Sequence, residues 1–169
     1  MKVFVTGVAG QLGHDVMNEL ASRGYTGVGT DLAESYSGIQ DGTYVTMAEY
    51  VSLDITNKSA VMNTIKAIKP DVVVHCAAWT AVDLAEDEDK QEKVKAINVD
   101  GTQNIAAACK VIDAKMVYIS TDYVFDGQGT TPWQPDCKDY KPLNVYGETK
   151  LGGELAVSNT LSKYFIVRI

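Results

Sequence analysis

Short apolar runs alternate along the chain with stretches in which apolar residues recur every three or four positions. Strands are predicted where β-branched and other apolar residues fill short segments, at 2–6, 26–30, 51–54, 72–76, 116–120 and 164–169. Helices are predicted where the apolar period is helical, at 11–23, 58–68, 88–112 and 146–158. Strands that alternate with helices are typical of a parallel sheet covered on both faces. The pattern therefore predicts an α/β fold built on a doubly wound parallel sheet.

One segment breaks this alternation. Residues 126–142 contain two glycines and three prolines and no apolar period, so a long loop is expected there. The whole chain of 169 residues suits one domain. Because the sequence stops at Ile169, inside the sixth predicted strand, we expect a fragment that lacks a C-terminal substrate-binding part.

Composition and charge exclude some partners. The formal net charge of -7 disfavours binding to nucleic acid or to an anionic membrane surface, because both are themselves negative. The first strand begins at once, without a secretory signal, and no apolar run approaches membrane-spanning length. The three cysteines lack the spacing of a disulfide framework or of a metal site. A cytoplasmic protein without a metal site is predicted.

Three glycines stand between the first predicted strand and the first predicted helix. Gly7 would permit a tight turn, Gly10 a close approach of the backbone to a pyrophosphate, and Gly13 close packing of helix on sheet. Asp31, 18 positions after Gly13, ends the second strand, where a carboxylate can accept from the ribose hydroxyls of a dinucleotide. That carboxylate would repel a 2′-phosphate, which favours NADH over NADPH. A plain glycine turn, and a capping role for Asp31, remain alternatives.

A tyrosine and a lysine four residues apart form the candidate catalytic pair. Tyr146 and Lys150 share one face of the last predicted helix. A free tyrosine titrates near ~10, so a neighbouring ammonium is needed to make it a useful acid at neutral pH. Thr121 follows the fifth strand, at the sheet edge where such folds place their sites, and can hydrogen-bond a carbonyl. A surface pair and a turn cap are the alternatives for these residues.

In these features the sequence resembles the extended short-chain dehydrogenase/reductase family. The stretches that carry the resemblance are 77–83, 120–127, 131–133 and 142–151. The resemblance implies a Rossmann-type domain and NADH or NADPH as cofactor. It also implies reduction of the 4-keto group of a dTDP-linked sugar, dTDP-4-dehydro-6-deoxy-L-mannose, to dTDP-L-rhamnose.

The resemblance assigns roles to individual residues. Tyr146 would protonate the alkoxide, Lys150 would lower the pKa of the tyrosine and hold the nicotinamide ribose, and Thr121 would orient the carbonyl. Asp122 and Tyr123 would touch the sugar, and Asn98 would support the site. The implied cofactor contacts, beside the three glycines and the Tyr–Lys pair, are Gln11, Leu12, Asp31, Asp54, Ile55, Ala77, Ala78 and Thr80.

Some questions stay open at this stage. His75 and Cys76 stand where the resemblance leads us to expect Asn and Ala, a change that packing should absorb. Some family members associate through magnesium-linked contacts, which leaves a homodimer and a role for Mg²⁺ open. Two other functions also remain: a nucleotide-sugar epimerase or dehydratase, and a non-catalytic dinucleotide-binding regulatory subunit.

Overall fold

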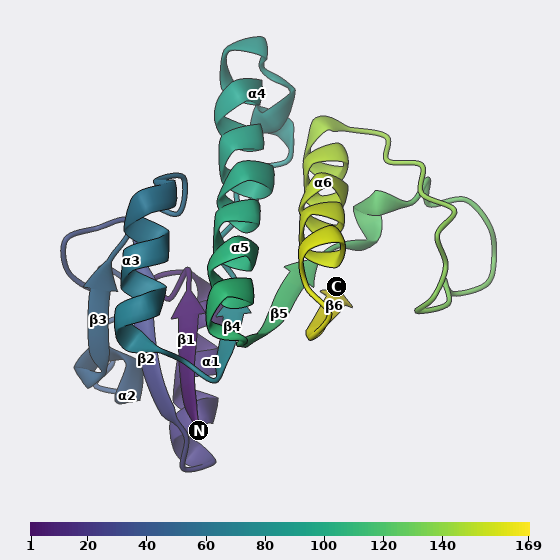
Figure 1. Ribbon diagram of the computed structural model, residues 1–169. Helices are drawn as coiled ribbons and strands as arrows, with labels where there is room; N and C mark the ends of the chain where they lie inside the picture. Colours follow the sequence, from purple (N-terminus) through teal and green to yellow (C-terminus); the bar gives the residue numbers. More distant parts are fainter.

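A six-stranded parallel sheet lies at the centre of the computed structural model, which describes residues 1–169 (Figure 1). The strand order is β3-β2-β1-β4-β5-β6. The strands are β1 (Lys2–Thr6), β2 (Thr26–Asp31), β3 (Glu49–Ser52), β4 (Val72–His75), β5 (Lys115–Ser120) and β6 (Tyr164–Arg168). The order runs outward in opposite directions from β1 and β4, and a crevice opens at the carboxyl ends of strands where such a reversal occurs. The predicted doubly wound sheet is confirmed.

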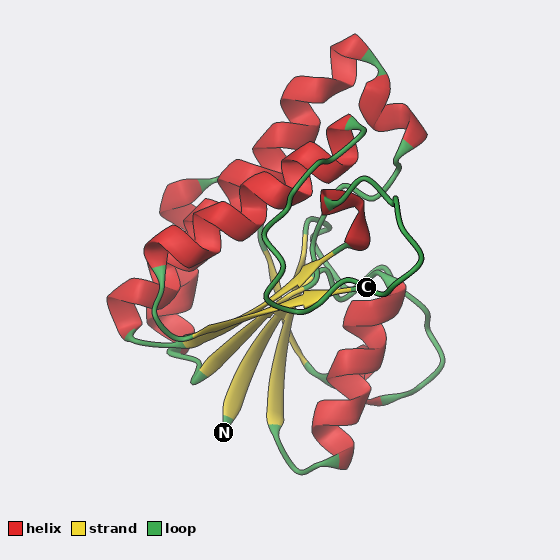
Figure 2. Cartoon of the chain, turned by 90° about the vertical axis from the view of Figure 1, so that its right-hand side faces the viewer, coloured by secondary structure: helices red, strands yellow, loops and turns green.

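Helices cover both faces of the sheet (Figure 2). On one face lie α1 (Gln11–Ser22) and the short α2 (Tyr44–Met47), which the sequence pattern did not indicate. On the other lie α3 (Lys58–Ile68), α5 (Thr102–Ile112) and α6 (Val145–Thr160). The sheet therefore separates two apolar layers.

The single helix expected at 88–112 is present with these bounds, but it contains a wide π-helical turn that the sequence did not indicate. The structure has α4 (Glu88–Lys95), then a π-helical turn η2 (Ala96–Gly101), then α5. Inside the turn, the buried Asn98 side chain bonds the backbone of Trp79 and the hydroxyl of Thr149. These long-range bonds account for the turn, since a π-turn re-aims side chains within a helix and often marks a functional site.

The third strand also differs from its prediction. Residues 51–54 were expected, but β3 is Glu49–Ser52, so Asp54 lies beyond the strand. There its carboxylate accepts from the backbone and the hydroxyl of Thr56 at 2.9 and 2.7 Å. The local turn favours this arrangement over continued pairing with β2. Two short 3₁₀ helices, η1 (Asp83–Glu86) and η3 (Asp122–Val124), were not expected either.

The larger part of the core lies under α3, α5 and α6. Sixteen buried residues form one cluster there, whereas a cluster of five lies on the α1 side.

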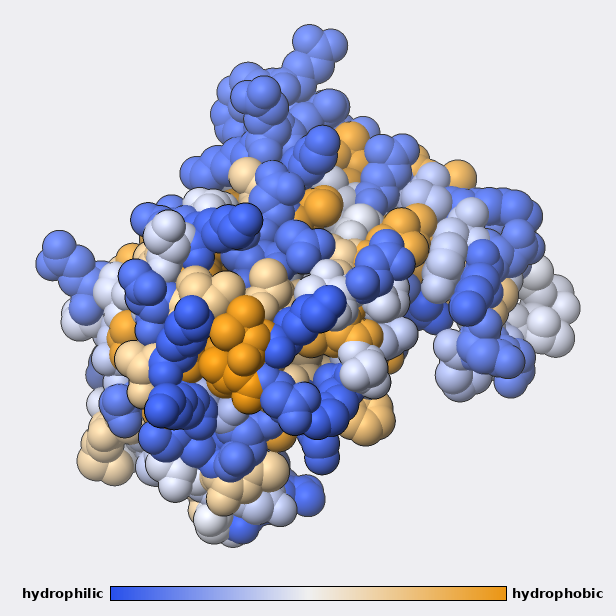
Figure 3. Space-filling model, in the orientation of Figure 1, coloured by the Kyte–Doolittle hydropathy of each residue, from blue (hydrophilic) through white to orange (hydrophobic).

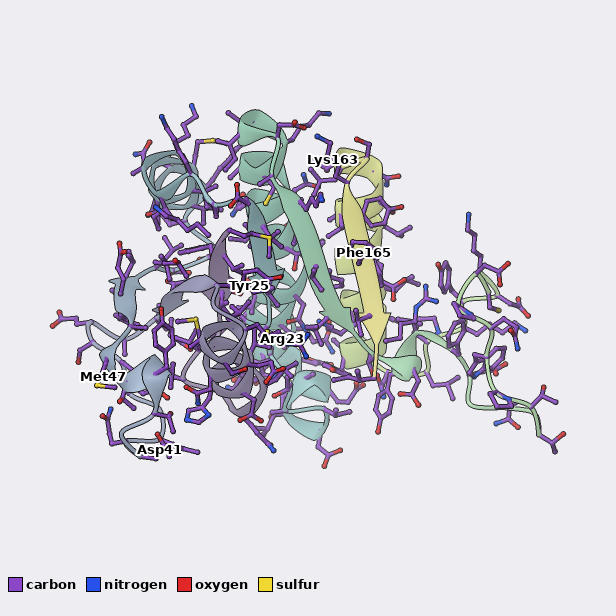
Figure 4. The ribbon with its side chains drawn as sticks, turned by 90° about the horizontal axis from the view of Figure 1, so that it is seen from below. Arg23, Tyr25, Asp41, Met47, Lys163 and Phe165 are labelled. Atoms are coloured by element: carbon purple, nitrogen blue, oxygen red, sulfur yellow. The ribbon has the colours of Figure 1, made fainter.

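Seen from the α3–α6 side, the surface is mostly hydrophilic, with a compact hydrophobic patch near the C-terminal end of α5 (Figure 3). On the opposite face of β6 the side chain of Phe165 is exposed (Figure 4). None of the helices combines the length and the apolar character needed to span a bilayer.

Residues 126–142 have no helix or strand, as expected for the long loop. This loop 126–142 extends outward beyond α6 and β6 (Figure 1). Its ends are held close to the domain: the Lys141 backbone amide donates to the Val124 carbonyl at 3.0 Å. The loop therefore begins and ends next to the carboxyl edge of β5.

Candidate active site

A crevice of about 680 Å³ opens at the carboxyl ends of β1, β2 and β4. This volume is within the usual range of small-molecule sites. Every residue expected to contact the cofactor lines it: Gly7, Gly10, Gln11, Leu12, Gly13, Asp31, Asp54, Ile55, Ala77, Ala78, Thr80, Tyr146 and Lys150. The structure thus brings together the glycine loop and the Tyr–Lys pair, which are far apart in the sequence.

The glycine loop requires glycine for steric reasons. Gly7 has a φ of +73°, and a Cβ there would lie 2.7 Å from the Ala77 backbone nitrogen. A Cβ on Gly13 would lie 2.2 Å from the Gly7 carbonyl oxygen. Gly10 differs, because its Cβ would meet nothing closer than 3.4 Å. Gly7 and Gly13 therefore serve close packing, while Gly10 leaves the backbone open to the crevice.

The first turn of α1 can hold an anion. Gly10 is the N-cap residue of α1 and has no side chain that could accept a hydrogen bond from the amides of the first turn. These amides therefore remain available to a ligand. Free amides and the helix dipole at such an N-terminus favour a phosphate group. The open crevice and this amide cradle fit a dinucleotide whose pyrophosphate rests on Gly10, Gln11 and Leu12.

Asp31 is fixed by two backbone amides. Its carboxylate accepts from Ala9 at 3.0 Å and from Leu32 at 2.8 Å. These bonds aim the carboxylate into the crevice beside the glycine loop. The segment that follows, 32–43, contains no lysine or arginine that could neutralise a 2′-phosphate.

Lys150 is a buried cation. Its side chain is 3 % exposed, donates to the Ile119 carbonyl at 2.6 Å, and lies 4.3 Å from the centre of the Tyr118 ring. Burial lowers the pKa of Lys150 to about 8, although the charge of Glu154 acts in the opposite direction. The ammonium is therefore close to its titration point at physiological pH.

The environment of Tyr146 differs from the expectation. Burial raises the pKa of its phenol, and a hydrogen bond with the Thr121 hydroxyl only partly offsets this. The expected lowering by Lys150 is not found, because the ammonium bonds the Ile119 carbonyl instead. In this structure Tyr146 is a protonated phenol, the form that can donate a proton.

The turn after β5 carries the other predicted residues. Thr121 is buried, and its hydroxyl accepts from the Tyr123 amide at 3.3 Å. Tyr123 is 45 % exposed, and its ring meets that of Tyr146 edge-on, with 5.7 Å between centroids. Asp122 is also exposed. These side chains lie next to the crevice but do not line it.

Asn98 holds the site together from the π-turn. Its oxygen accepts from the Trp79 amide at 2.8 Å, while its nitrogen donates to the Trp79 carbonyl at 3.2 Å and to the Thr149 hydroxyl at 3.1 Å. Thr149 directly precedes Lys150 on α6. Asn98 therefore links the loop after β4 to the helix with the candidate catalytic pair.

His75 has a larger role than the sequence suggested. Nδ1 lies 2.7 Å from the Thr6 hydroxyl and Nε2 lies 3.1 Å from the Thr102 hydroxyl. Thr102 donates to the Asn98 carbonyl, so Nε2 donates to the Thr102 hydroxyl. In the neutral ring Nδ1 then accepts from the Thr6 hydroxyl. Burial lowers the pKa of His75 to about 3, in agreement with a neutral ring. Hydrogen bonding as well as packing accommodates this residue.

A metal site is not formed by these side chains, since no three His, Cys, Asp or Glu residues gather closely enough to hold an ion. Cys76 lines the crevice, but burial raises the pKa of its thiol to about 12.

Sequence reasoning missed Glu154 and Arg168, which form an ion pair between α6, the helix with the candidate catalytic pair, and β6. A glutamate in a helix and an arginine in a strand give no local signal of such a pair.

A family model described as RmlD substrate binding domain matches residues 1–169. The chain belongs to this family. The dTDP-4-dehydrorhamnose reductase of Escherichia coli strain K12 is 36% identical over 168 residues, 99% of this chain and 50% of that protein. The methionine adenosyltransferase 2 subunit beta of Pongo abelii is 33% identical over 156 residues, 92% of this chain and 42% of that protein.

A similar solved structure is the dTDP-4-dehydrorhamnose reductase of Bacillus anthracis in complex with NADP. The TM-score is 0.82 at 37% identity, and the match covers 99% of this chain and 52% of that one. The chain spans about half the length of the curated relatives that it matches first. The family resemblance seen in the sequence is confirmed.

Proposed function

We propose that this chain binds a reduced nicotinamide dinucleotide and reduces the 4-keto group of dTDP-4-dehydro-6-deoxy-L-mannose to give dTDP-L-rhamnose. The observation that carries the proposal is the single crevice that both the uncapped N-terminus of α1 and the Tyr146–Lys150 pair line. The names of the relatives support the substrate, and the NADP in the related structure supports the cofactor. In this proposal residues 1–169 are the dinucleotide-binding domain.

The residues of the site suit the chemistry of ketone reduction. The dinucleotide supplies a hydride when it is bound. Tyr146, a protonated phenol in this structure, gives its proton to the oxygen of the reduced carbonyl. The Thr121 hydroxyl beside it orients that oxygen. The Lys150 ammonium bonds the Ile119 carbonyl in this structure and would have to turn towards Tyr146 to stabilise the phenolate that remains. Asp122 and Tyr123, exposed at the edge of the site, contact the sugar.

The deciding experiment follows NADH and NADPH oxidation with the dTDP-4-keto sugar by the full-length protein. Tyr146→Phe should lower kcat by about 10²- to 10⁴-fold, the usual contribution of a positioned proton donor, and leave dinucleotide affinity within about twofold. Tyr25→Phe is the matched control, because Tyr25 does not line the crevice. If Tyr146→Phe turned over sugar as fast as wild type, the proposed role of the phenol would be refuted.

We further propose that NADH is preferred. The Asp31 carboxylate at the crevice and the absence of lysine and arginine from 32–43 both disfavour a 2′-phosphate. Asp31→Ser should raise the ratio of NADPH to NADH affinity by about tenfold, or ~1.4 kcal/mol, in a fluorescence titration. An unchanged ratio would remove Asp31 as the determinant. The same assays with EDTA added test whether activity depends on Mg²⁺. Sedimentation of the full-length protein tests whether it is a homodimer.

A second candidate is a dinucleotide-binding regulatory subunit without catalysis. The similarity to methionine adenosyltransferase 2 subunit beta favours it. Wild type and Tyr146→Phe would then bind dinucleotide equally and both fail to oxidise it with the keto sugar. Turnover by wild type alone would exclude this candidate.

A further inference from the structure

A partly buried ion pair lies next to the candidate site, and its carboxylate reaches the proposed chemistry only through its charge, which raises the pKa of Lys150. Glu154, on α6, is 2 % exposed. Its carboxylate accepts from Arg168 Nε at 2.8 Å and Nη2 at 2.7 Å, and from the Ser120 hydroxyl at 2.6 Å. The pair therefore joins α6 to the carboxyl ends of β5 and β6.

Arg168 continues the network into the loop 126–142. Nη2 also donates to the Tyr140 hydroxyl at 3.0 Å, and Nη1 donates to the Pro135 carbonyl at 3.4 Å. The guanidinium carbon lies 5.2 Å from the centre of the Phe125 ring and 5.4 Å from that of Tyr140. Trp133 stacks on Phe125 with 4.5 Å between ring centres. One arginine thus contacts Phe125, just before the loop, and Pro135 and Tyr140 in the second half of the loop.

The segments that meet here are those that carry the candidate catalytic residues. Ser120 precedes Thr121, and Glu154 stands one helical turn after Lys150. The loop 126–142 connects the Thr121 turn to the start of α6. A buried ion pair adds little net stability, but a partner left alone in a buried place is strongly unfavourable. Arrangements that keep Glu154 and Arg168 together are therefore favoured over those that separate them.

We propose that Glu154 and Arg168 are positioning residues that hold the loop 126–142 against β5 and α6, so that the sugar-facing side of the site keeps one shape. The pair acts through the loop and touches neither sugar nor cofactor. The effect on sugar binding rests on the proposed function, whereas the effect on the loop does not. The two can therefore be measured separately.

Hydrogen exchange on the full-length protein tests the loop directly. Arg168→Lys and Glu154→Gln should speed exchange of the amides of residues 126–142 by at least about tenfold, as expected for local opening. Lys163→Gln is the matched control: it removes an exposed ion pair with Asp113 just before the same strand, far from the loop, and should leave this exchange unchanged. Tyr140→Phe removes one loop contact of Arg168 and provides a milder variant if Glu154→Gln does not fold.

Steady-state kinetics test the consequence. Arg168→Lys should raise KM for the keto sugar about fivefold or more, while dinucleotide affinity changes by less than about twofold. The proposal would be overturned if amide exchange accelerated evenly over the whole domain. It would also be overturned if Arg168→Lys and Tyr140→Phe both left the exchange rates of the loop 126–142 unchanged. If wild type itself did not turn over the sugar, the proposed function would fail, but the exchange result would still decide the role of the pair.

Discussion

At the scale of single residues, Lys150 is a cation in a costly environment. It is 3 % exposed, and its hydrogen bond to the Ile119 carbonyl and its position over the Tyr118 ring compensate only part of the lost hydration. The pKa therefore falls from 10.5 to about 8. The groups that face it are Glu154 on α6, Tyr118 on β5, His75 at the end of β4, and Cys76 directly after β4.

Turnover should decline as the pH rises through about 8, the pKa of Lys150. Below this value the ammonium is present and, once it turns from the Ile119 carbonyl, can stabilise the phenolate that Tyr146 leaves after proton transfer. Above it the charge is lost. The measurement is kcat/KM at pH values of about 6 to 10. Lys150→Arg keeps its charge over this range and should abolish this decline, whatever its absolute rate. A wild-type profile that stays flat to about pH 10 would contradict the assignment.

The last two glycines of the crevice loop, Gly10 and Gly13, should respond differently to alanine. At Gly13 a Cβ would overlap the Gly7 carbonyl at 2.2 Å, whereas at Gly10 the nearest atom is 3.4 Å away. Gly13→Ala should therefore cost about 2 to 3 kcal/mol in the free energy of unfolding, as overpacking does. Gly10→Ala should cost less than about 1 kcal/mol but weaken dinucleotide binding. Urea unfolding and fluorescence titration measure the two effects, and equal stability losses would refute this division.

At the scale of elements, two asparagines cap helices in the same way. The Asn144 side chain accepts from the Gly147 amide at 2.7 Å at the start of α6, and that of Asn57 accepts from the Ala60 amide at 3.0 Å at the start of α3. Only α6 carries the candidate catalytic pair. The caps therefore form a natural comparison between a helix at the site and a helix remote from it.

Asn144→Ala and Asn57→Ala should each lower the free energy of unfolding by about 1 kcal/mol, the usual cost of a lost cap. Only Asn144→Ala should also lower kcat, because Tyr146 lies in the first turn of α6 and needs that turn to be ordered. Chemical denaturation and initial-rate assays provide the two readouts. A matching fall in kcat for Asn57→Ala would show that general destabilisation is responsible.

How far the sequence predicts each element depends on the range of the interactions that shape it. The strands and the glycine loop follow from local patterns, so the sheet and the lining of the crevice could be predicted. The π-turn could not, because Asn98 finds its partners 19 and 51 positions away. Likewise Glu154 meets Arg168 only through the packing of α6 against β6. The apolar period itself continues through the turn.

At the scale of the molecule, the two faces of the sheet contribute unequally to the hydrophobic core. Sixteen buried residues pack under α3, α5 and α6, and five pack on the α1 side, where the crevice loop lies. Fewer buried contacts mean that the α1 side opens more easily. A ligand that bridges α1, the end of β2 and α6 should therefore stabilise the domain noticeably.

Dinucleotide binding should be visible as thermal stabilisation. At a concentration about 100 times Kd, a ligand that binds only the folded state adds about 2.7 kcal/mol. For a chain of this size that corresponds to a rise in Tm of about 5 to 10 °C. Tyr146→Phe should keep this shift, because the phenol serves the proton transfer, whereas Gly10→Ala should reduce it by altering the amide cradle of α1. Scanning calorimetry with NADH and with NADPH measures the shift without relying on turnover. An unchanged Tm with both dinucleotides at millimolar concentration would mean that the crevice binds something else.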